Sequence, residues 1–153
     1  MGTSSDNTVL VRRVRAGRAL DSRTIARRAS RILALLDLDG AELSIVLCDD
    51  AFIRALNRDY RGLDRPTDVL SFPQDGAGDR RRPAILGDVV ISLETASRQA
   101  RAGRRALLDE ATALLVHGVL HLVGCDHERP RDAAKMFSRA ARLEKQIKSQ
   151  KHY

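Results

Sequence analysis

The feature that most constrains the fold is a segment that is apolar on almost every side. Residues 105–123 read RALLDEATALLVHGVLHLV, and charged side chains occur only in its first turns. A helix that is apolar nearly all round has to be covered by other elements on several sides. We therefore expect a buried central helix from about residue 105 to about 123, with one stripe formed by Leu108, Ala111, Leu115, Gly118 and Leu122.

Shorter patterns surround this helix and define the rest of the fold. β-Branched and apolar runs predict strands over 8–14, 42–48, 67–72 and 85–93. Capping residues and helical spacing predict helices from Asp21 to about 36, from Asp49 or Asp50 to about 60, and over 94–102 and 131–149. Strands and helices that do not alternate strictly are typical of an α+β fold with a small mixed sheet of four strands and about five helices.

No repeat or linker divides the 153 residues, so we expect a single domain over 1–153. The segment 73–84 is expected to be an exposed loop, because it carries two prolines, two glycines and three consecutive arginines. The basic tail, about 149–153, is expected to lack fixed structure.

The composition points to a basic protein that works in a reducing compartment. Lys and Arg number 27 against 20 Asp and Glu, a formal charge of +7, which favours a polyanionic partner. Aromatic residues make up only 3%, so a protein that binds single strands through an array of stacking platforms is disfavoured. No apolar run approaches the ~20 residues of a membrane span, and two cysteines suit the cytosol. We expect a cytoplasmic protein without a membrane segment.

Three of the four histidines lie between residues 117 and 127. His117 and His121 are four residues apart on the predicted helix, so their rings project from the same face. Gly124 can adopt a left-handed conformation that ends the helix and returns His127 to the same point. The spacing predicts a three-histidine metal site, for which zinc is favoured, although nickel, copper and iron accept the same ligands.

This spacing is that of the metzincin proteases, with one difference. Their general-base glutamate follows the first histidine, where this chain has Gly118. Three protein ligands leave a metal position open for chemistry, whereas Cys125 as a fourth ligand would close the site. Asp126 is expected either to orient a histidine or to hold the turn.

Three separated motifs carry a family resemblance. They are LNRDYRGLDRPTDVLSFP at 56–73, LGDVVIS at 86–92 and HGVLHLVGCDHE at 117–128. Together they resemble the YbeY family of bacterial metal-dependent endoribonucleases over about residues 42–137. Cys125 departs from the pattern, because the family commonly has a tyrosine at that place.

The resemblance implies a single-domain α+β fold that binds one Zn²⁺ through His117, His121 and His127. It also implies cleavage of single-stranded RNA, with a role in maturing the 3′ end of 16S rRNA and in ribosome quality control. The partners would be the 16S rRNA precursor, the small ribosomal subunit and ribosome-associated proteins. The family's functionally important arginine falls on Arg61.

A mechanism built on these residues assigns catalysis to Arg61, His117 and His121. Arg61 would offer a planar fork of donors to the scissile phosphate. The proton could be handled by a metal-activated water, by the RNA 2′-hydroxyl, or by a carboxylate such as Asp126 or Asp68. Ser71 and Asp68 are expected mainly at a turn and a strand end, with a weaker case for lining the cleft.

Two other classes of function stay open at this stage. The protein could be an RNA-binding or ribosome-binding assembly factor whose metal holds the fold. It could also be a metallopeptidase-like hydrolase, which would need a base other than residue 118.

Overall fold

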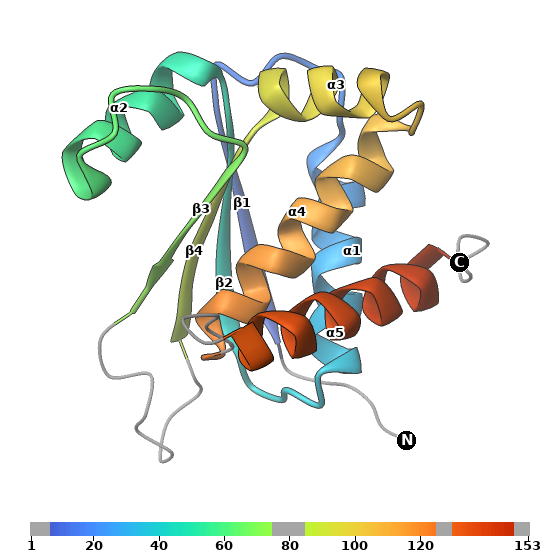
Figure 1. Ribbon diagram of the computed structural model, residues 1–153. Coiled ribbons are helices and arrows are strands. Elements are labelled where there is room, and N and C mark those ends of the chain that lie inside the picture. The colour runs from blue at the N-terminus through green and yellow to red at the C-terminus, as the bar shows by residue number, and fades with distance from the viewer. Residues whose placement is uncertain (1–6, 75–84, 125–129, 149–153) are drawn as a thin grey trace.

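The computed structural model describes residues 7–74, 85–124 and 130–148 of the chain (Figure 1). Within them lie four strands, which are β1 (Thr8–Val14), β2 (Glu42–Cys48), β3 (Val69–Pro73) and β4 (Ile85–Ser92). Five helices accompany them: α1 (Ser22–Leu35), α2 (Asp50–Arg61), α3 (Leu93–Ala102), α4 (Leu107–Leu122) and α5 (Pro130–Lys148). The predicted α+β class is confirmed. The expected disordered tail lies outside the described residues, as does most of the expected loop.

The four strands form one mixed sheet in the order β1-β2-β4-β3. β1 and β2 are parallel, β2 and β4 are parallel, and β3 runs antiparallel to β4 at the edge of the sheet. Several predicted boundaries differ from the structure by one or two residues, and α4 begins at Leu107 and not at about 105. The strand expected over 67–72 begins only at Val69, because the carboxylate of Asp68 accepts a hydrogen bond from the Val69 N–H. Leu93 belongs to α3 because Ser92 caps that helix.

One face of the sheet is covered by α1 and α4, α5 packs against these two helices, and the main core lies there (Figure 1). α4 is buried on almost all sides, as its sequence predicts. Leu115, Val116, Val119 and Leu120 have no exposed surface, and they pack in one cluster with Leu43, Ile45 and Ile91 of the sheet. None of the helices in the described ranges is long and apolar enough to cross a lipid bilayer.

On the opposite face of the sheet α2 is the one helix among the described residues, and it lies over the end where β2 and β4 finish (Figure 1). A smaller apolar cluster fills this contact: Val46, Cys48, Ile53, Leu70 and Val90. Burial raises the pKa of the Cys48 thiol to about 12, so this cysteine is a packing residue and not a reactive one. Away from α2, no helix of the described residues covers this face, and Leu10 of β1 is 54% exposed.

Candidate functional site

A cleft of about 540 Å³ lies where α2, β3 and α4 meet. Its lining comes from three separate stretches of sequence, and the residues are Tyr60, Arg61, Leu70, Ser71, Phe72, Pro73 and His121. Two of the residues singled out from the sequence as catalytic, Arg61 and His121, thus border one cavity. The volume is within the range of ~300–1,000 Å³ that is usual for ligand sites.

The two histidines of α4 lie one turn apart on a helix that the core holds in place. His121 is exposed and borders the cleft, and His117 is half-buried. α4 ends at Leu122, and Gly124 has a φ of +93°, the left-handed conformation that its sequence position predicts. The structure therefore fixes the first two histidines and the turn that follows them.

The third predicted ligand, His127, lies outside the described residues, together with Cys125 and Asp126. Within residues 7–74, 85–124 and 130–148, no three His, Cys, Asp or Glu side chains form a cluster that could hold a metal ion. The described part of the donor set still fits zinc, since two imidazoles at positions i and i+4 of a helix are a recurrent pair of zinc ligands.

Position 118, between the two histidines, is tightly packed against the sheet. A Cβ added to Gly118 would lie 2.7 Å from Cγ1 of Val89 and 3.2 Å from Oγ of Ser71. α4 therefore approaches β3 and β4 so closely that a side chain at position 118 would force Val89 to shift. A glutamate, which metzincin proteases carry at this place, would collide with the sheet.

Arg61 is the last residue of α2, and a glycine C-cap sets its place. Gly62 has a φ of +71°, and its N–H donates to the carbonyl of Arg58, so the chain leaves the helix directly after Arg61. Arg61 is exposed and borders the cleft.

Charge pairing separates Arg61 from its neighbours on α2. Arg54 pairs with Asp64 at 2.8 Å, and Arg58 pairs with Asp59 at 3.0 Å. No carboxylate of the described residues pairs with Arg61. Its guanidinium is thus available to an anion in the cleft.

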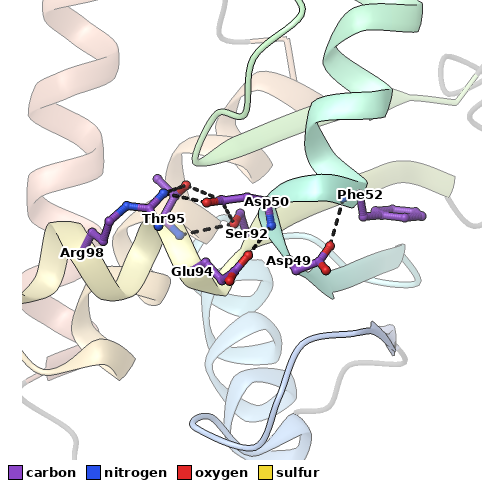
Figure 2. A network of polar contacts seen from close by, with 7 residues as sticks. All are labelled: Asp49, Asp50, Phe52, Ser92, Glu94, Thr95 and Arg98. Carbon is purple, nitrogen blue, oxygen red and sulfur yellow. Dashed lines mark hydrogen bonds and ion pairs between the residues drawn. The ribbon is translucent and has the colours of Figure 1, made fainter.

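The other end of α2 is held by a polar network that ties it to α3 (Figure 2). Asp49 caps α2 by accepting the N–H of Phe52 at 2.9 Å, and this hydrogen bond lowers the pKa of Asp49. Asp50 accepts hydrogen bonds from Ser92 and Thr95 at 2.6 Å each.

Arg98 completes the network with an ion pair to Asp50 at 2.7 Å. Burial raises the pKa of Asp50, but the three donors outweigh burial and hold the pKa below its ordinary value. The Asp50 N–H in turn donates to Glu94 at 2.7 Å. Because α2 carries Arg61, these contacts position one side of the cleft.

Asp68 and Ser71 have different places in the structure. Asp68 lies just before β3, and its carboxylate accepts hydrogen bonds from the Val69 N–H at 2.8 Å and from Gln99 at 3.2 Å. It does not border the cleft. Ser71 lies in the middle of β3 and borders the cleft, and its hydroxyl donates to the carbonyl of Gly118 at 3.0 Å.

The aromatic wall of the cleft was not predicted from the sequence. Tyr60 and Phe72 meet edge to face, with ring centroids 5.3 Å apart. Both flank residues that the motifs had singled out, Arg61 and Ser71. The sequence pattern does not distinguish Tyr60, because an aromatic residue near a helix end is common. Only the fold shows that its side chain is 70% exposed.

The matching family model and two similar relatives carry the same name. The family model described as Endoribonuclease YbeY matches residues 15–148. The chain is similar to an Endoribonuclease YbeY of Persephonella marina, at 42% identity over 144 residues that cover 94% of each chain. It is also similar to an Endoribonuclease YbeY of Anaeromyxobacter sp. (strain Fw109-5), at 51% identity over 125 residues, which cover 80% of this chain and 62% of that relative.

Among solved structures, the fold is similar to that of TM1509 from Thermotoga maritima, determined in solution. The TM-score is 0.67, and the match covers 94% of this chain and 92% of the other. The identity of 23% makes this a likeness of fold alone.

Proposed function

The chain belongs to the Endoribonuclease YbeY family, and on this premise we propose that it is a metal-dependent endoribonuclease that cuts single-stranded RNA in the cleft between α2, β3 and α4. One observation carries the proposal. An arginine without a carboxylate partner among the described residues and a histidine of the predicted metal set border the same cavity. Cleavage of a phosphodiester is helped by a cationic donor fork on the phosphate and by a Lewis-acidic metal, and residues for both border this cleft.

The metal we propose is zinc, held by His117, His121 and His127. When bound, it would supply Lewis acidity to the phosphate and make a nearby water more acidic. The rest of the chemistry belongs to the side chains of the cleft.

Arg61 would bind the scissile phosphate and neutralise the charge that grows on its oxygens. Tyr60 and Phe72 would wall the cleft and exclude part of the solvent. No carboxylate stands among the cleft-lining residues that the structure describes, and Asp68 is bonded elsewhere. Proton transfer would therefore rest on water, on the RNA 2′-hydroxyl or on Asp126.

The substrate we propose is the 16S rRNA precursor, cut near its 3′ end on or near the small ribosomal subunit in the cytoplasm, with ribosome-associated proteins as further partners. The formal charge of +7 supports an RNA partner, since Lys and Arg release counterions from phosphates on binding.

The structure favours this activity over the other two classes. A metallopeptidase of the metzincin type needs a glutamate at residue 118, and Val89 and Ser71 leave no space for one. An assembly factor with a structural metal needs that metal to hold the fold. The main core instead packs α4 through apolar side chains that have no exposed surface. We therefore expect chelation to remove cleavage and to change the melting temperature little.

The test compares Arg61→Ala, His121→Ala and the matched control Arg58→Ala, which removes an exposed arginine of the same helix outside the cleft. We measure metal per chain by mass spectrometry and cleavage of an end-labelled single-stranded 16S precursor, with and without chelator. Arg61→Ala should keep the metal and lose about 100-fold in rate, the usual cost of one donor to a developing anion. His121→Ala should lose both metal and cleavage.

Arg58→Ala should cut like the wild type. Wild-type protein that carries one metal per chain and leaves the precursor intact would contradict the proposal. So would cleavage that survives in Arg61→Ala at the wild-type rate. A duplex of the same sequence, which should resist, serves as the strand-specificity control.

A further inference from the structure

A second hollow, of about 340 Å³, lies beside the cleft on the sheet face that carries α2. Figure 1 shows α2 over one end of this face, and the lining of the hollow comes from α2 and from all four strands. The residues that matter are Arg12 of β1, Phe52 and Tyr60 of α2, Phe72 of β3, and Asp88 of β4. Of these residues, Tyr60 and Phe72 also line the cleft, whereas the other three do not.

The hollow concentrates the aromatic side chains of a chain that has few. The sequence contains three phenylalanines and two tyrosines, and three of these five residues line this one cavity. Tyr60 is 70% exposed, although a tyrosine ring gains free energy by burial. An exposed ring at the mouth of an aromatic hollow is suited to stack on a planar ligand.

The hollow also holds two opposite charges that do not neutralise each other. Asp88 and Arg12 lie on strands separated by β2, and neither forms a hydrogen bond or an ion pair through its side chain within the described residues. In the β3–β4 ladder Asp88 is the direct partner of Phe72, so carboxylate and ring stand side by side on one face. A ligand here meets an acceptor and a donor fork beside an aromatic wall.

The hollow adjoins the cleft. Tyr60 and Phe72 line both cavities, and their edge-to-face pair is the wall between them. Arg61 follows Tyr60 directly and faces the other side of this wall. A nucleotide whose phosphate lies at Arg61 would thus have a base within reach of the second hollow.

We propose that this hollow is a subsite for one unstacked guanine base adjacent to the phosphate that is cut. The inference rests on the proposed function and adds a base preference to it. Guanine fits because the Asp88 carboxylate only accepts hydrogen bonds, and the N1–H and N2 amino groups of guanine are two adjacent donors that match its two oxygens. Guanine O6 and N7 are two acceptors that match the fork of Arg12. The other bases place at most one donor group on such an edge.

The first test reads base preference from cleavage. Single-stranded RNA with randomised positions around one site is cut, and the new ends are sequenced. Wild-type protein should favour guanine about 10-fold at one position beside the cut, as a good bidentate contact allows. Asp88→Asn keeps the shape and replaces one acceptor by a donor, so the preference should fall to about twofold or less while cleavage continues.

The matched control is Asp59→Asn, which removes an exposed carboxylate next to Tyr60 but outside both cavities. It should keep the guanine preference. If wild-type protein cuts without base preference, or if Asp59→Asn and Asp88→Asn behave alike, the subsite is overturned and the proposed nuclease function stands.

A second test works without cleavage. The chain has two tyrosines, so protein labelled at tyrosine gives two ring signals, and Tyr60→Phe identifies that of Tyr60. Titration with 5′-GMP should shift the Tyr60 signal upfield through stacking. Inosine 5′-monophosphate differs from 5′-GMP only in lacking the N2 amino group. The wild-type protein should bind it about 10-fold more weakly than 5′-GMP, whereas Asp88→Asn should bind the two nucleotides equally well.

This titration separates the two hypotheses. If the wild type cuts no RNA but the shift with 5′-GMP depends on Asp88, the nuclease proposal fails and the guanine site stands. Equal shifts with 5′-GMP and with the nucleotides of adenine, cytosine and uracil, or no shift at all, overturn the guanine site.

Discussion

The two helices that border the cleft are held in opposite ways. α4 is buried on almost every side by apolar residues, and its first residue is preceded by Ala106, which makes no side-chain cap. α2 buries only Ile53 and Asn57 fully, and it is fixed at its ends by the Asp49 cap and the Gly62 turn. The histidines thus stand on the part of the fold that burial stabilises, and Arg61 stands on the part that polar contacts stabilise.

This difference matters for a site that handles a metal and a phosphate. Metal ligands need positions fixed to fractions of an ångström, which a packed core provides. An arginine that binds a flexible polyanion tolerates more freedom, because its long side chain can adjust. If the two helices are held independently, changes in the apolar core of α4 and in the contacts of α2 should lower stability by different amounts.

The largest effect is expected from Leu115→Ala in α4. Leu115 has no exposed surface, and its loss leaves a cavity in the main core, which should lower the free energy of unfolding by about 3 kcal/mol. Leu56→Ala, the same change at a partly buried site of α2, should cost about 1 kcal/mol. Urea unfolding of both variants measures the two losses in free energy. Equal losses would contradict the difference between α4 and α2.

A smaller loss is expected from Asp50→Ala in the polar network of α2 and α3. At neutral pH this change should lower the free energy of unfolding by about 2 kcal/mol. The pKa of Asp50 is lower in the folded protein than its ordinary value of 3.8. The contribution of this carboxylate is therefore fully present above that value and is lost as the pH falls through the folded pKa.

Unfolding curves between pH 3 and pH 7 should show the wild type and Asp50→Ala converging at the acid end. Ser97→Ala changes a residue that lies between Thr95 and Arg98 in α3 and is not among the donors to Asp50; it serves as the control and should stay parallel to the wild type. A gap that is constant with pH would show that the charge of Asp50 does not stabilise the contact between α2 and α3.

The smallest net effect is expected from Gly118→Ala. The added methyl group collides with Val89, at a cost of about 2 kcal/mol, but alanine gains about 1 kcal/mol over glycine in a helix. The net loss should be about 1 kcal/mol. Adding Val89→Ala makes space for the methyl group, so the double variant should be more stable than the two single costs predict. Strict additivity in this cycle would mean that residue 118 does not touch Val89.

The sequence predicted the elements and their contents better than their arrangement. α4 and the strands at 8–14 and 42–48 were recognised because long apolar periodicity and β-branched runs are local signals. The strand order was not predicted, because pairing of β2 with β4 depends on contacts between residues far apart in the chain. The same limit applies to Asp68, which the sequence left as a cleft candidate and which Gln99 of α3 engages instead.

The candidate site divides in the same way. The histidine spacing and the left-handed Gly124 follow from helix geometry, so sequence alone placed them. The reason for Gly118 could not be read from the sequence, since it is the approach of β3 and β4 to α4 that makes a larger residue collide with Val89. The shared wall of Tyr60 and Phe72 likewise exists only after α2 and β3 have met.

The cleft is assembled from the end of α2, from β3 and from the last turn of α4, and this order has a consequence for biosynthesis. Chains emerge from the ribosome N-terminus first, at roughly 5–20 residues per second. Arg61 and the aromatic wall emerge first, and His121 reaches them only after the intervening strand and two helices have been made. The newly made chain therefore holds an incomplete site for several seconds, and the activity we propose begins only when α4 docks onto the sheet.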